Sequence, residues 1–205
     1  YSEDFLKEKN PFSEVVPSGK VIIGYAGSMG VTNALEPFIE TIQMMKENSN
    51  IHFVLVGSGD LRESYEEQLK DCSNVTFLQR IQQSEVKYFL DACDILYLST
   101  KDSKVWDYGQ SMNKVVEYML AAKPIIASYT GYPSMINEAD CGKFINSTSA
   151  DDIKDAILYY GNMSPEERID VGIKGRKWIF ENRTYPVLGK KYLDAIVFHS
   201  VKQKK

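Results

Sequence analysis

Residues 21–30 read Val-Ile-Ile-Gly-Tyr-Ala-Gly-Ser-Met-Gly, an apolar run that closes on Gly27 and Gly30. A β-branched run of this length predicts a buried strand that ends in a tight loop. Beyond the loop, apolar residues recur at helical spacing from Leu35 to Met45, which predicts a helix. The chain thus begins an alternation of strand, loop and helix that points to an α/β fold.

The same alternation continues along the chain. Further strands are predicted at 51–56, 75–78, 95–98, 125–128 and 142–145, and further helices from 61 onward and at 84–91, 113–122, 132–137, 150–160, 165–181 and 185–201. Asp60 and Ser84 are the expected caps of two helices, and the run from Ser164 to Glu167 is a strong helix start. We expect one doubly wound parallel sheet with helices on both faces and a helical C-terminus.

The composition is that of an ordinary soluble domain. The 205 residues are 43% hydrophobic and 25% charged, in the range of globular proteins. The net charge of -4 disfavours a general affinity for nucleic acid or anionic lipid. Cys72, Cys93 and Cys141 are odd in number and far apart, which favours reduced thiols in a cytosolic domain over disulfides or a CxxC metal site.

The N-terminal sequence has no signal-peptide pattern, and no apolar run approaches the roughly 18 residues of a spanning helix. Because the chain starts at Tyr1, we expect it to be cut from a longer protein, with residues 1–19 as a linker or residual interdomain segment. His52 and His199 stand alone, so neither is expected to bind a metal or to act as a catalytic base.

Ligands of doubly wound sheets bind where the strands end, near the point at which the strand order reverses. The first such loop, Gly24 to Gly30, reads GxxGxxG and lacks both the GxGxxG of dinucleotide binders and the lysine of a P-loop. Its backbone amides either bind an anion or only form a tight turn. After the second strand, Gly57-Ser58-Gly59 favours a turn. The strand end itself has no acidic residue for a nicotinamide ribose and Asp60 is assigned to a helix cap, which disfavours an oxidoreductase.

The most informative segment reads Tyr108-Gly-Gln-Ser-Met-Asn-Lys-Val-Val-Glu117 and continues Tyr-Met-Leu-Ala-Ala-Lys-Pro124. Lys114 and Glu117 are three residues apart and therefore share one face of the predicted helix. A carboxylate can accept two hydrogen bonds from a ribose diol and an ammonium can bind a phosphate, so the pair suits a nucleotide. An exposed ion pair without a ligand is the alternative.

This segment resembles the donor-nucleotide signature of retaining glycosyltransferases of family four, which have the GT-B architecture, and especially the branch that builds surface polysaccharides. The resemblance rests on Tyr108, Gly109, Ser111, Asn113, Lys114, Glu117, Tyr118, Met119, Lys123 and Pro124, and it extends over nearly the whole chain after Lys20. It implies that residues 20–205 form the Rossmann-like, nucleotide-sugar-binding C-terminal domain of such an enzyme, and that the N-terminal, acceptor-binding domain is absent.

The resemblance also implies roles for individual residues. Glu117 corresponds to the glutamate that holds the ribose, whereas Gly109 stands where the family has its first motif glutamate. Backbone amides of residues 110–112 would face the diphosphate or sugar, residues 79–81 would border the base, and Lys114, helped by Arg80, would neutralise the leaving diphosphate. The full donor-binding set expected is Gly27, Ser28, Gly30, Gln79, Arg80, Ile81, Gly109, Gln110, Ser111, Met112, Lys114 and Glu117.

The function implied is transfer of a sugar, with retention, from a nucleoside diphosphate donor to a carbohydrate or lipid-linked acceptor. UDP is favoured over GDP, no cofactor or metal is expected, and the catalytic residues cannot be named because much of the site lies in the other domain. We expect a cytoplasmic protein, leave open a peripheral membrane association of the full-length enzyme, and expect this domain to be inactive alone. A non-catalytic nucleotide-sugar-binding or scaffolding module is the alternative, motivated by Gly109 and by Val31 and Asn33 in the stretch of the family's basic pair.

Two other apolar groups are interpreted as structural. Trp178, Ile179 and Phe180 are expected to pack at the end of their helix. The stripe on the last helix is expected to belong to the core rather than to a cofactor site, with part of it exposed because this helix crosses toward the N-terminal domain in two-domain relatives; it comprises Leu188, Tyr192, Leu193 and Ile196.

Overall fold

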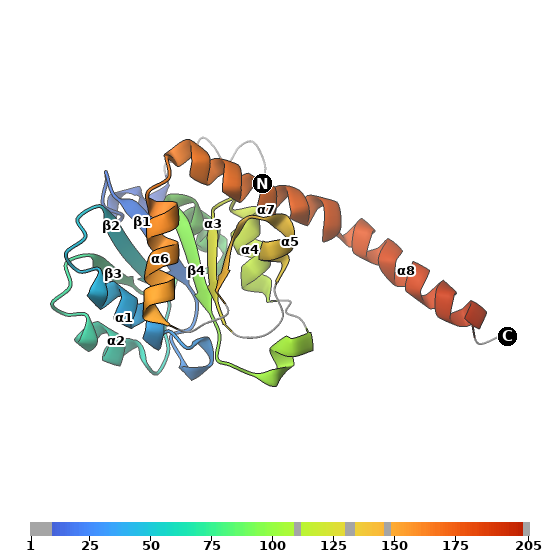
Figure 1. Ribbon diagram of the computed structural model, residues 1–205, viewed down its shortest axis with the longest axis horizontal. Coiled ribbons are helices and arrows are strands. Elements are labelled where there is room, and N and C mark those ends of the chain that lie inside the picture. Colours follow the sequence, from blue (N-terminus) through green and yellow to red (C-terminus); the bar gives the residue numbers. More distant parts are fainter. Residues whose placement is uncertain (1–9, 109–111, 130–133, 146–148, 203–205) are drawn as a thin grey trace.

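The computed structural model describes residues 10–108, 112–129, 134–145 and 149–202. At its centre is a six-stranded sheet in the order β3-β2-β1-β4-β5-β6, in which every pair of neighbours is parallel (Figure 1). The strands are β1 Val21–Ala26, β2 Ile51–Val56, β3 Val75–Leu78, β4 Ile95–Ser99, β5 Ile125–Ser128 and β6 Gly142–Ile145. The strand order reverses between β1 and β4, as expected of a doubly wound sheet.

Within the described residues, eight α-helices and three 3₁₀ helices connect and flank these strands. The α-helices are α1 Glu36–Met44, α2 Arg62–Gln68, α3 Gln83–Ala92, α4 Asn113–Leu120, α5 Met135–Ala139, α6 Ala150–Gly161, α7 Pro165–Asn182 and α8 Tyr185–Lys202, and the 3₁₀ helices are η2 Pro11–Glu14, η3 Val31–Asn33 and η4 Lys104–Tyr108. Helices α1, α2 and α6 cover one face of the sheet, whereas α3, α4, α5 and α7 cover the other (Figure 1). The predicted α/β fold with helices on both faces is confirmed.

The sheet is buried on both faces, which is why its strands are nearly continuous apolar runs. Along β4, Ile95 and Tyr97 join the buried cluster under α1, α2 and α6, while Leu96 and Leu98 join the cluster on the opposite face. This alternation follows from the two-residue period of a strand. The two clusters fix the register of the sheet and hence the positions of the loops at its carboxyl edge.

Two of the predicted helix caps are wrong. Helix α2 begins after Leu61, and no side chain caps it, so Asp60 lies outside the cap. Helix α3 begins one residue before Ser84, because Gln82 and Glu85 form a capping box in which Gln82 N donates to Glu85 Oε2 over 2.8 Å. The helix start at Ser164 is confirmed: its Oγ accepts from Glu167 N, and the helix continues to Asn182.

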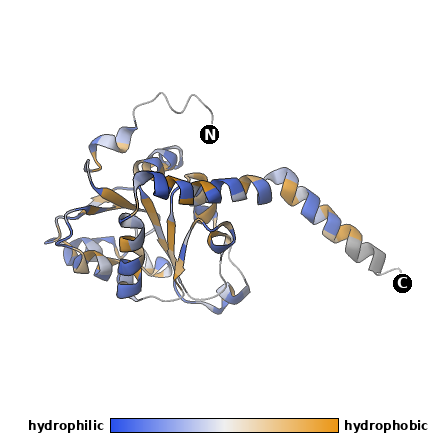
Figure 2. Cartoon of the chain, turned by 45° about the horizontal axis from the view of Figure 1, so that its top comes forward, coloured by the Kyte–Doolittle hydropathy of each residue, from blue (hydrophilic) through white to orange (hydrophobic). Residues whose placement is uncertain are grey.

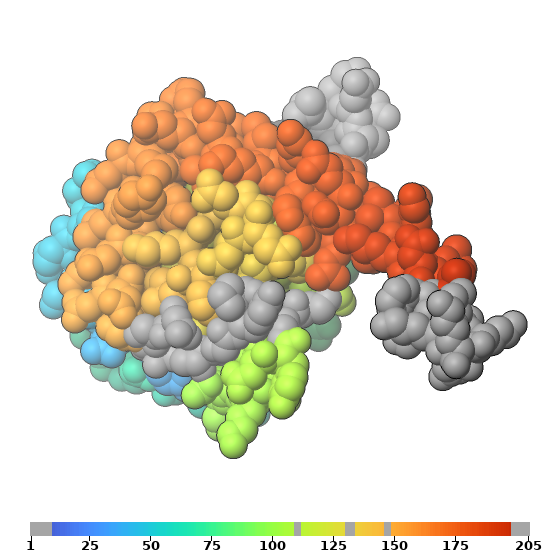
Figure 3. Space-filling view, turned by 45° about the vertical axis from the view of Figure 1, so that its right-hand side comes forward, coloured from blue at the N-terminus to red at the C-terminus, as the bar shows by residue number. Residues whose placement is uncertain are grey.

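The last helix, α8, extends away from the body of the molecule (Figures 1, 2 and 3). Its apolar side chains do not belong to the core: Tyr192 is 70% exposed and Leu193 is 62% exposed, and Leu188 and Ile196 are exposed too. The expectation that this stripe belongs to the core is therefore wrong, whereas the expected exposure of part of it is confirmed. At the end of α7, Ile179 is buried, whereas Phe180 is exposed, contrary to the packing expected.

Within the described ranges, no helix is both long and apolar enough to span a membrane.

Candidate functional site

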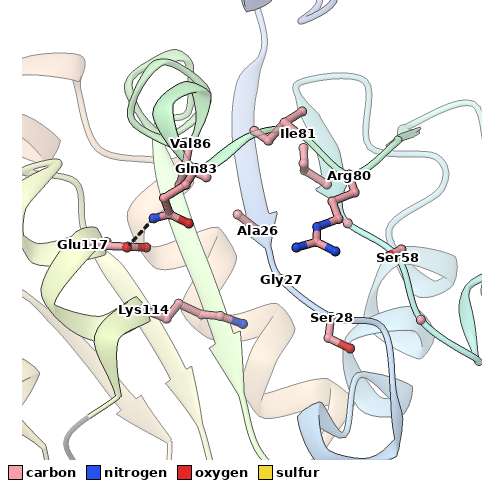
Figure 4. Close-up of a pocket in the computed structure, with 13 residues that line it drawn as sticks. Ala26, Gly27, Ser28, Ser58, Arg80, Ile81, Gln83, Val86, Lys114 and Glu117 are labelled. Atoms are coloured by element: carbon pink, nitrogen blue, oxygen red, sulfur yellow. Dashed lines mark hydrogen bonds between the residues drawn. The ribbon is translucent and has the colours of Figure 1, made fainter.

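A cavity of about 530 Å³ opens at the carboxyl edge of the sheet, beside the reversal between β1 and β4 (Figure 4). Its walls are residues 26–28 at the end of β1, residues 56–59 at the end of β2, Arg80 and Ile81 after β3, Gln83 and Val86 of α3, and Lys114 and Glu117 of α4. The chain thus places its cavity where open parallel sheets bind ligands.

The floor of the cavity is made by two glycine loops that pack backbone against backbone. Gly27 N donates to the carbonyl oxygen of Val56 over 3.0 Å, and Met29 N donates to that of Ser58 over 2.8 Å. Gly57 has a positive φ of 147°, and a Cβ there would overlap the Gly27 carbonyl oxygen. This agrees with the interpretation of 57–59 as a turn, but the same residues also line the cavity, which the sequence analysis missed.

Helix α4 is attached to the end of β1 by its tyrosine. Ala26 N donates to Tyr118 Oη over 2.9 Å, and the buried Tyr118 hydroxyl donates back to the Ala26 carbonyl oxygen over 3.3 Å. The apolar stripe of α4, including Val115 and Met119, packs on the sheet below. Since a helix presents residues three apart on one face, this attachment directs Lys114 and Glu117 together into the cavity.

The Lys114 side chain extends from α4 toward Gly27, which follows the end of β1 (Figure 4). Its Nζ lies 4.4 Å from the centroid of the Tyr25 ring and 3.4 Å from Tyr25 Oη. A Cβ on Gly27 would overlap this ammonium, so the absence of a side chain there admits the lysine. Burial lowers the pKa of Lys114 to about 8, and the nearby Glu117 carboxylate offsets part of that effect.

Glu117 is held one turn further along α4. Gln83 Nε2 donates to Glu117 Oε1 over 2.8 Å, across the gap between α3 and α4 (Figure 4). The second carboxylate oxygen can accept from a ligand without breaking this bond. Lys114 therefore contacts Tyr25 and Glu117 contacts Gln83, which differs from the exposed ion pair considered as the alternative.

Arg80 completes the charges of the cavity from the opposite side. It follows β3, and its guanidinium points inward toward the side chain of Lys114 (Figure 4). Among the described lining residues, the charged groups are these two cations and the Glu117 carboxylate. Such a set suits a ligand that carries both a strong anion and hydroxyl groups.

The structure brings together six of the residues expected in the site: Gly27, Ser28, Arg80, Ile81, Lys114 and Glu117. Three others do not line the cavity: Gly30 lies at the start of η3, Gln79 is exposed after β3, and Met112 precedes α4 and packs against the core. Gly109, Gln110 and Ser111 lie outside the described residues.

Gln83, Val86 and Ser58 line the cavity and were not predicted. The sequence did contain an indication for Gln83. It stands two residues after Ile81, at the start of the helix that follows a strand ending at the cavity edge of the sheet.

No group of three or more His, Cys, Asp or Glu side chains in the described ranges could hold a metal ion. His52 lies at the opposite, amino end of β2, where its Nε2 and Thr76 Oγ1 are 2.8 Å apart. Burial lowers the pKa of this imidazole, so it is neutral at physiological pH. His52 therefore has a structural role, as expected for a histidine that stands alone in the sequence.

The strand order 3-2-1-4-5-6, with a cavity at its reversal, defines a Rossmann-like domain. Residues 20–162 match the family described as glycosyl transferases group 1, and the chain belongs to that family. No curated protein matches the chain by sequence comparison.

Solved structures show the same fold at low sequence identity. The C-terminal domain of LpcC, a glycosyl transferase group 1 protein from Francisella tularensis, superposes with a TM-score of 0.70 at 18% identity, over 86% of this chain and 92% of that domain. WaaG, a glycosyltransferase involved in lipopolysaccharide biosynthesis, gives a TM-score of 0.70 at 19% identity, over 89% of this chain. HepE from Anabaena, in complex with UDP and glucose, gives 0.70 at 11% identity, over 91% of this chain. The chain corresponds to 48% of the WaaG chain and 50% of the HepE chain, and its fold is that of GT-B C-terminal domains.

Proposed function

We propose that this chain is the donor-binding domain of a retaining glycosyltransferase that moves a sugar from a nucleoside diphosphate donor to a carbohydrate or lipid-linked acceptor. The observation that carries the proposal is the convergence of Lys114, Arg80 and Glu117 on one cavity at the strand-order reversal. Membership of the glycosyl transferases group 1 family supports the reaction class.

In this proposal the three charged groups support one orientation of the donor. Glu117 accepts hydrogen bonds from the ribose hydroxyls, because its carboxylate is fixed by Gln83 and keeps a free oxygen. The diphosphate lies over residues 27–28, within reach of Lys114, and the base lies toward Arg80 and Ile81. UDP is the favoured nucleotide, and the presence of UDP in the HepE structure is consistent with this choice.

When the diphosphate departs, negative charge develops on it. Cations and hydrogen-bond donors must already point at that position in the free enzyme in order to stabilise the charge. A charged hydrogen bond contributes about 1.5–3 kcal/mol, so Lys114 and Arg80 together supply a useful part of that stabilisation. The family's basic pair is replaced by Val31 and Asn33 on η3, and neither of these lines the cavity. Lys114 therefore takes the place of a cation supplied by the first loop.

The acceptor and the remaining catalytic groups belong, in this proposal, to a second domain of a longer cytoplasmic enzyme. The chain corresponds to about half the length of WaaG and HepE, which supports a two-domain parent. We further propose metal-independent transfer, inactivity of this domain alone, and a role in polysaccharide synthesis, for which the lipopolysaccharide function of WaaG is the nearest parallel. Peripheral membrane attachment would belong to the full-length protein.

Calorimetry of UDP and GDP with this chain tests the donor site. Substituting Glu117→Ala removes the ribose acceptor, and we expect it to weaken UDP binding about 10-fold or more. Glu40→Ala is the matched control, because Glu40 is exposed on α1 and does not line the cavity. Undiminished UDP binding by the Glu117 variant would exclude the ribose assignment, and absence of any nucleotide binding by the wild type would exclude the function.

The alternative of a non-catalytic nucleotide-sugar-binding or scaffolding module is favoured by Gly109 in place of the first motif glutamate and by Val31 and Asn33 in place of the basic pair. Turnover by the full-length protein with a panel of UDP- and GDP-sugars separates the two functions. Binding without turnover, in the presence of candidate acceptors, would favour the module.

A further inference from the structure

We propose that Tyr25 is a positioning residue, whose hydroxyl links the Lys114 ammonium to the loop at 27–28 and so holds the cation where a diphosphate binds. The inference rests on the proposed function for its ligand, but it concerns a residue that does not line the cavity and that the sequence analysis did not assign to the site.

Tyr25 stands at the junction of three elements. It is the fifth residue of β1 and is fully buried, with its ring in the cluster under α1, α2 and α6. Its hydroxyl donates to the Ser28 carbonyl oxygen over 2.6 Å, and this uses its only proton. The oxygen is then free to accept from Lys114 Nζ, which lies 3.4 Å away.

This arrangement connects the two faces of the sheet at its edge. Lys114 starts from α4 on one face, and Tyr25 packs on the other, so the lysine reaches its partner only by passing over Gly27. The Tyr25 hydroxyl also satisfies the Ser28 carbonyl oxygen, so the same side chain contacts both the loop and the lysine. A phenylalanine would fill the core equally well, so packing alone does not require the hydroxyl.

The electrostatic effect of Tyr25 opposes that of burial. Burial lowers the pKa of Lys114 to about 8. The face of the Tyr25 ring, 4.4 Å from Nζ, and the lone pairs of its hydroxyl both favour the charged ammonium. The other groups around it are Glu117 on its own helix, which also favours the charge, Arg80 across the cavity, which opposes it, and the neutral Tyr118.

A double-mutant cycle on UDP binding tests the link between the two residues. We expect Tyr25→Phe to weaken UDP binding about 3- to 10-fold, the range of one net hydrogen bond. In a Lys114→Met background the same substitution should change UDP binding less than about 2-fold, because the cation it positions is gone. In the protein that keeps Lys114, Tyr25→Phe should also lower the pH at which UDP binding is lost on the alkaline side, because the hydroxyl no longer favours the charged ammonium.

Tyr97→Phe is the matched control. Tyr97 is a buried tyrosine of the neighbouring strand, lies in the same cluster and does not line the cavity, so its substitution should leave UDP binding and its pH profile unchanged. A measurement on the wild type needs no variant at all: the ε-methylene protons of Lys114 should show an upfield ring-current shift in the NMR spectrum, caused by the Tyr25 ring.

The outcomes separate this inference from the proposed function. If the wild type binds no nucleotide, the donor site itself is excluded. If the wild type binds UDP and Lys114→Met weakens binding, but Tyr25→Phe has no effect or has the same effect in both backgrounds, Tyr25 is only structural. Absence of the ring-current shift would likewise overturn the inference.

Discussion

Lys114→Met should make the protein more stable while it weakens nucleotide binding. The pKa of Lys114 falls from an ordinary 10.5 to about 8 in the folded chain. A difference of one pH unit corresponds to about 1.4 kcal/mol, so the buried charge costs the folded state up to about 3 kcal/mol at pH 7. Because Lys114 is partly exposed to the cavity, we expect solvent to reduce this cost, and the variant to gain about 1–2 kcal/mol.

The pH dependence of this gain identifies its cause. In the unfolded chain Lys114 keeps its proton up to about pH 10.5, whereas in the folded chain it loses the proton above about pH 8. The cost of the buried charge is therefore constant below pH 8 and shrinks as the pH rises from 8 to 10.5. Wild type and variant should approach equal stability near pH 10.

Urea denaturation at pH 7 and pH 10 measures both quantities, with Lys104→Met as the control. Lys104 is exposed on η4, so its substitution should change the unfolding free energy by less than about 0.5 kcal/mol. A Lys114 variant that is less stable than the wild type at pH 7 would refute the reasoning. A gain that persists undiminished at pH 10 would attribute it to packing of the methionine instead of removal of a charge.

Three further outcomes follow from the same contacts. UDP affinity should be constant from pH 7 to about pH 8 and then fall with rising pH as free Lys114 loses its proton, measured by calorimetry above pH 7, where the nucleotide is fully ionised. Gly57→Ala should lower the unfolding free energy by roughly 2–4 kcal/mol, because the new Cβ meets the Gly27 carbonyl oxygen. Gly189 on α8 has open space around it, so Gly189→Ala is the control and should not destabilise the protein in the same denaturation experiment. Ser164→Ala should lose about 1 kcal/mol through the capping box of α7, and an unchanged denaturation midpoint would contradict that role.

The central strands could be predicted because β2 and β4, for example, are short runs of mostly apolar residues between loops, as expected of strands that are buried on both faces. The caps of α2 and α3 could not be chosen from the sequence. Ser84 and Gln82 are both polar and two residues apart, and the selection of Gln82 depends on the extended backbone it adopts after β3. Local propensity cannot supply that information, because the path of the chain between two elements is set by their packing.

The part of the site that lies on a single helix could be predicted from the sequence. Lys114 and Glu117 share a helix face, and three-residue spacing is sufficient to place them together. The bond from Gln83 to Glu117 joins residues 34 apart in sequence, so it depends on how α3 and α4 lie over the sheet. The stripe of α8 has the same periodicity whether it faces a core or solvent, because periodicity reports that a helix has an apolar face and not what lies against it.

Gly27, Tyr25 and Lys114 form one interdependent arrangement. The lysine can lie beside Gly27 only where residue 27 lacks a side chain, and the ring and hydroxyl of Tyr25 favour the charged form of its ammonium. If the cation came from the loop after β1, Val31 or Asn33 would have to supply it, and neither side chain is basic. A basic residue introduced there without loss of Lys114 would add charge beside a lysine that burial already pushes toward neutrality. In the proposed donor site, the cation beside Gly27 is therefore carried by α4 and not by the loop after β1.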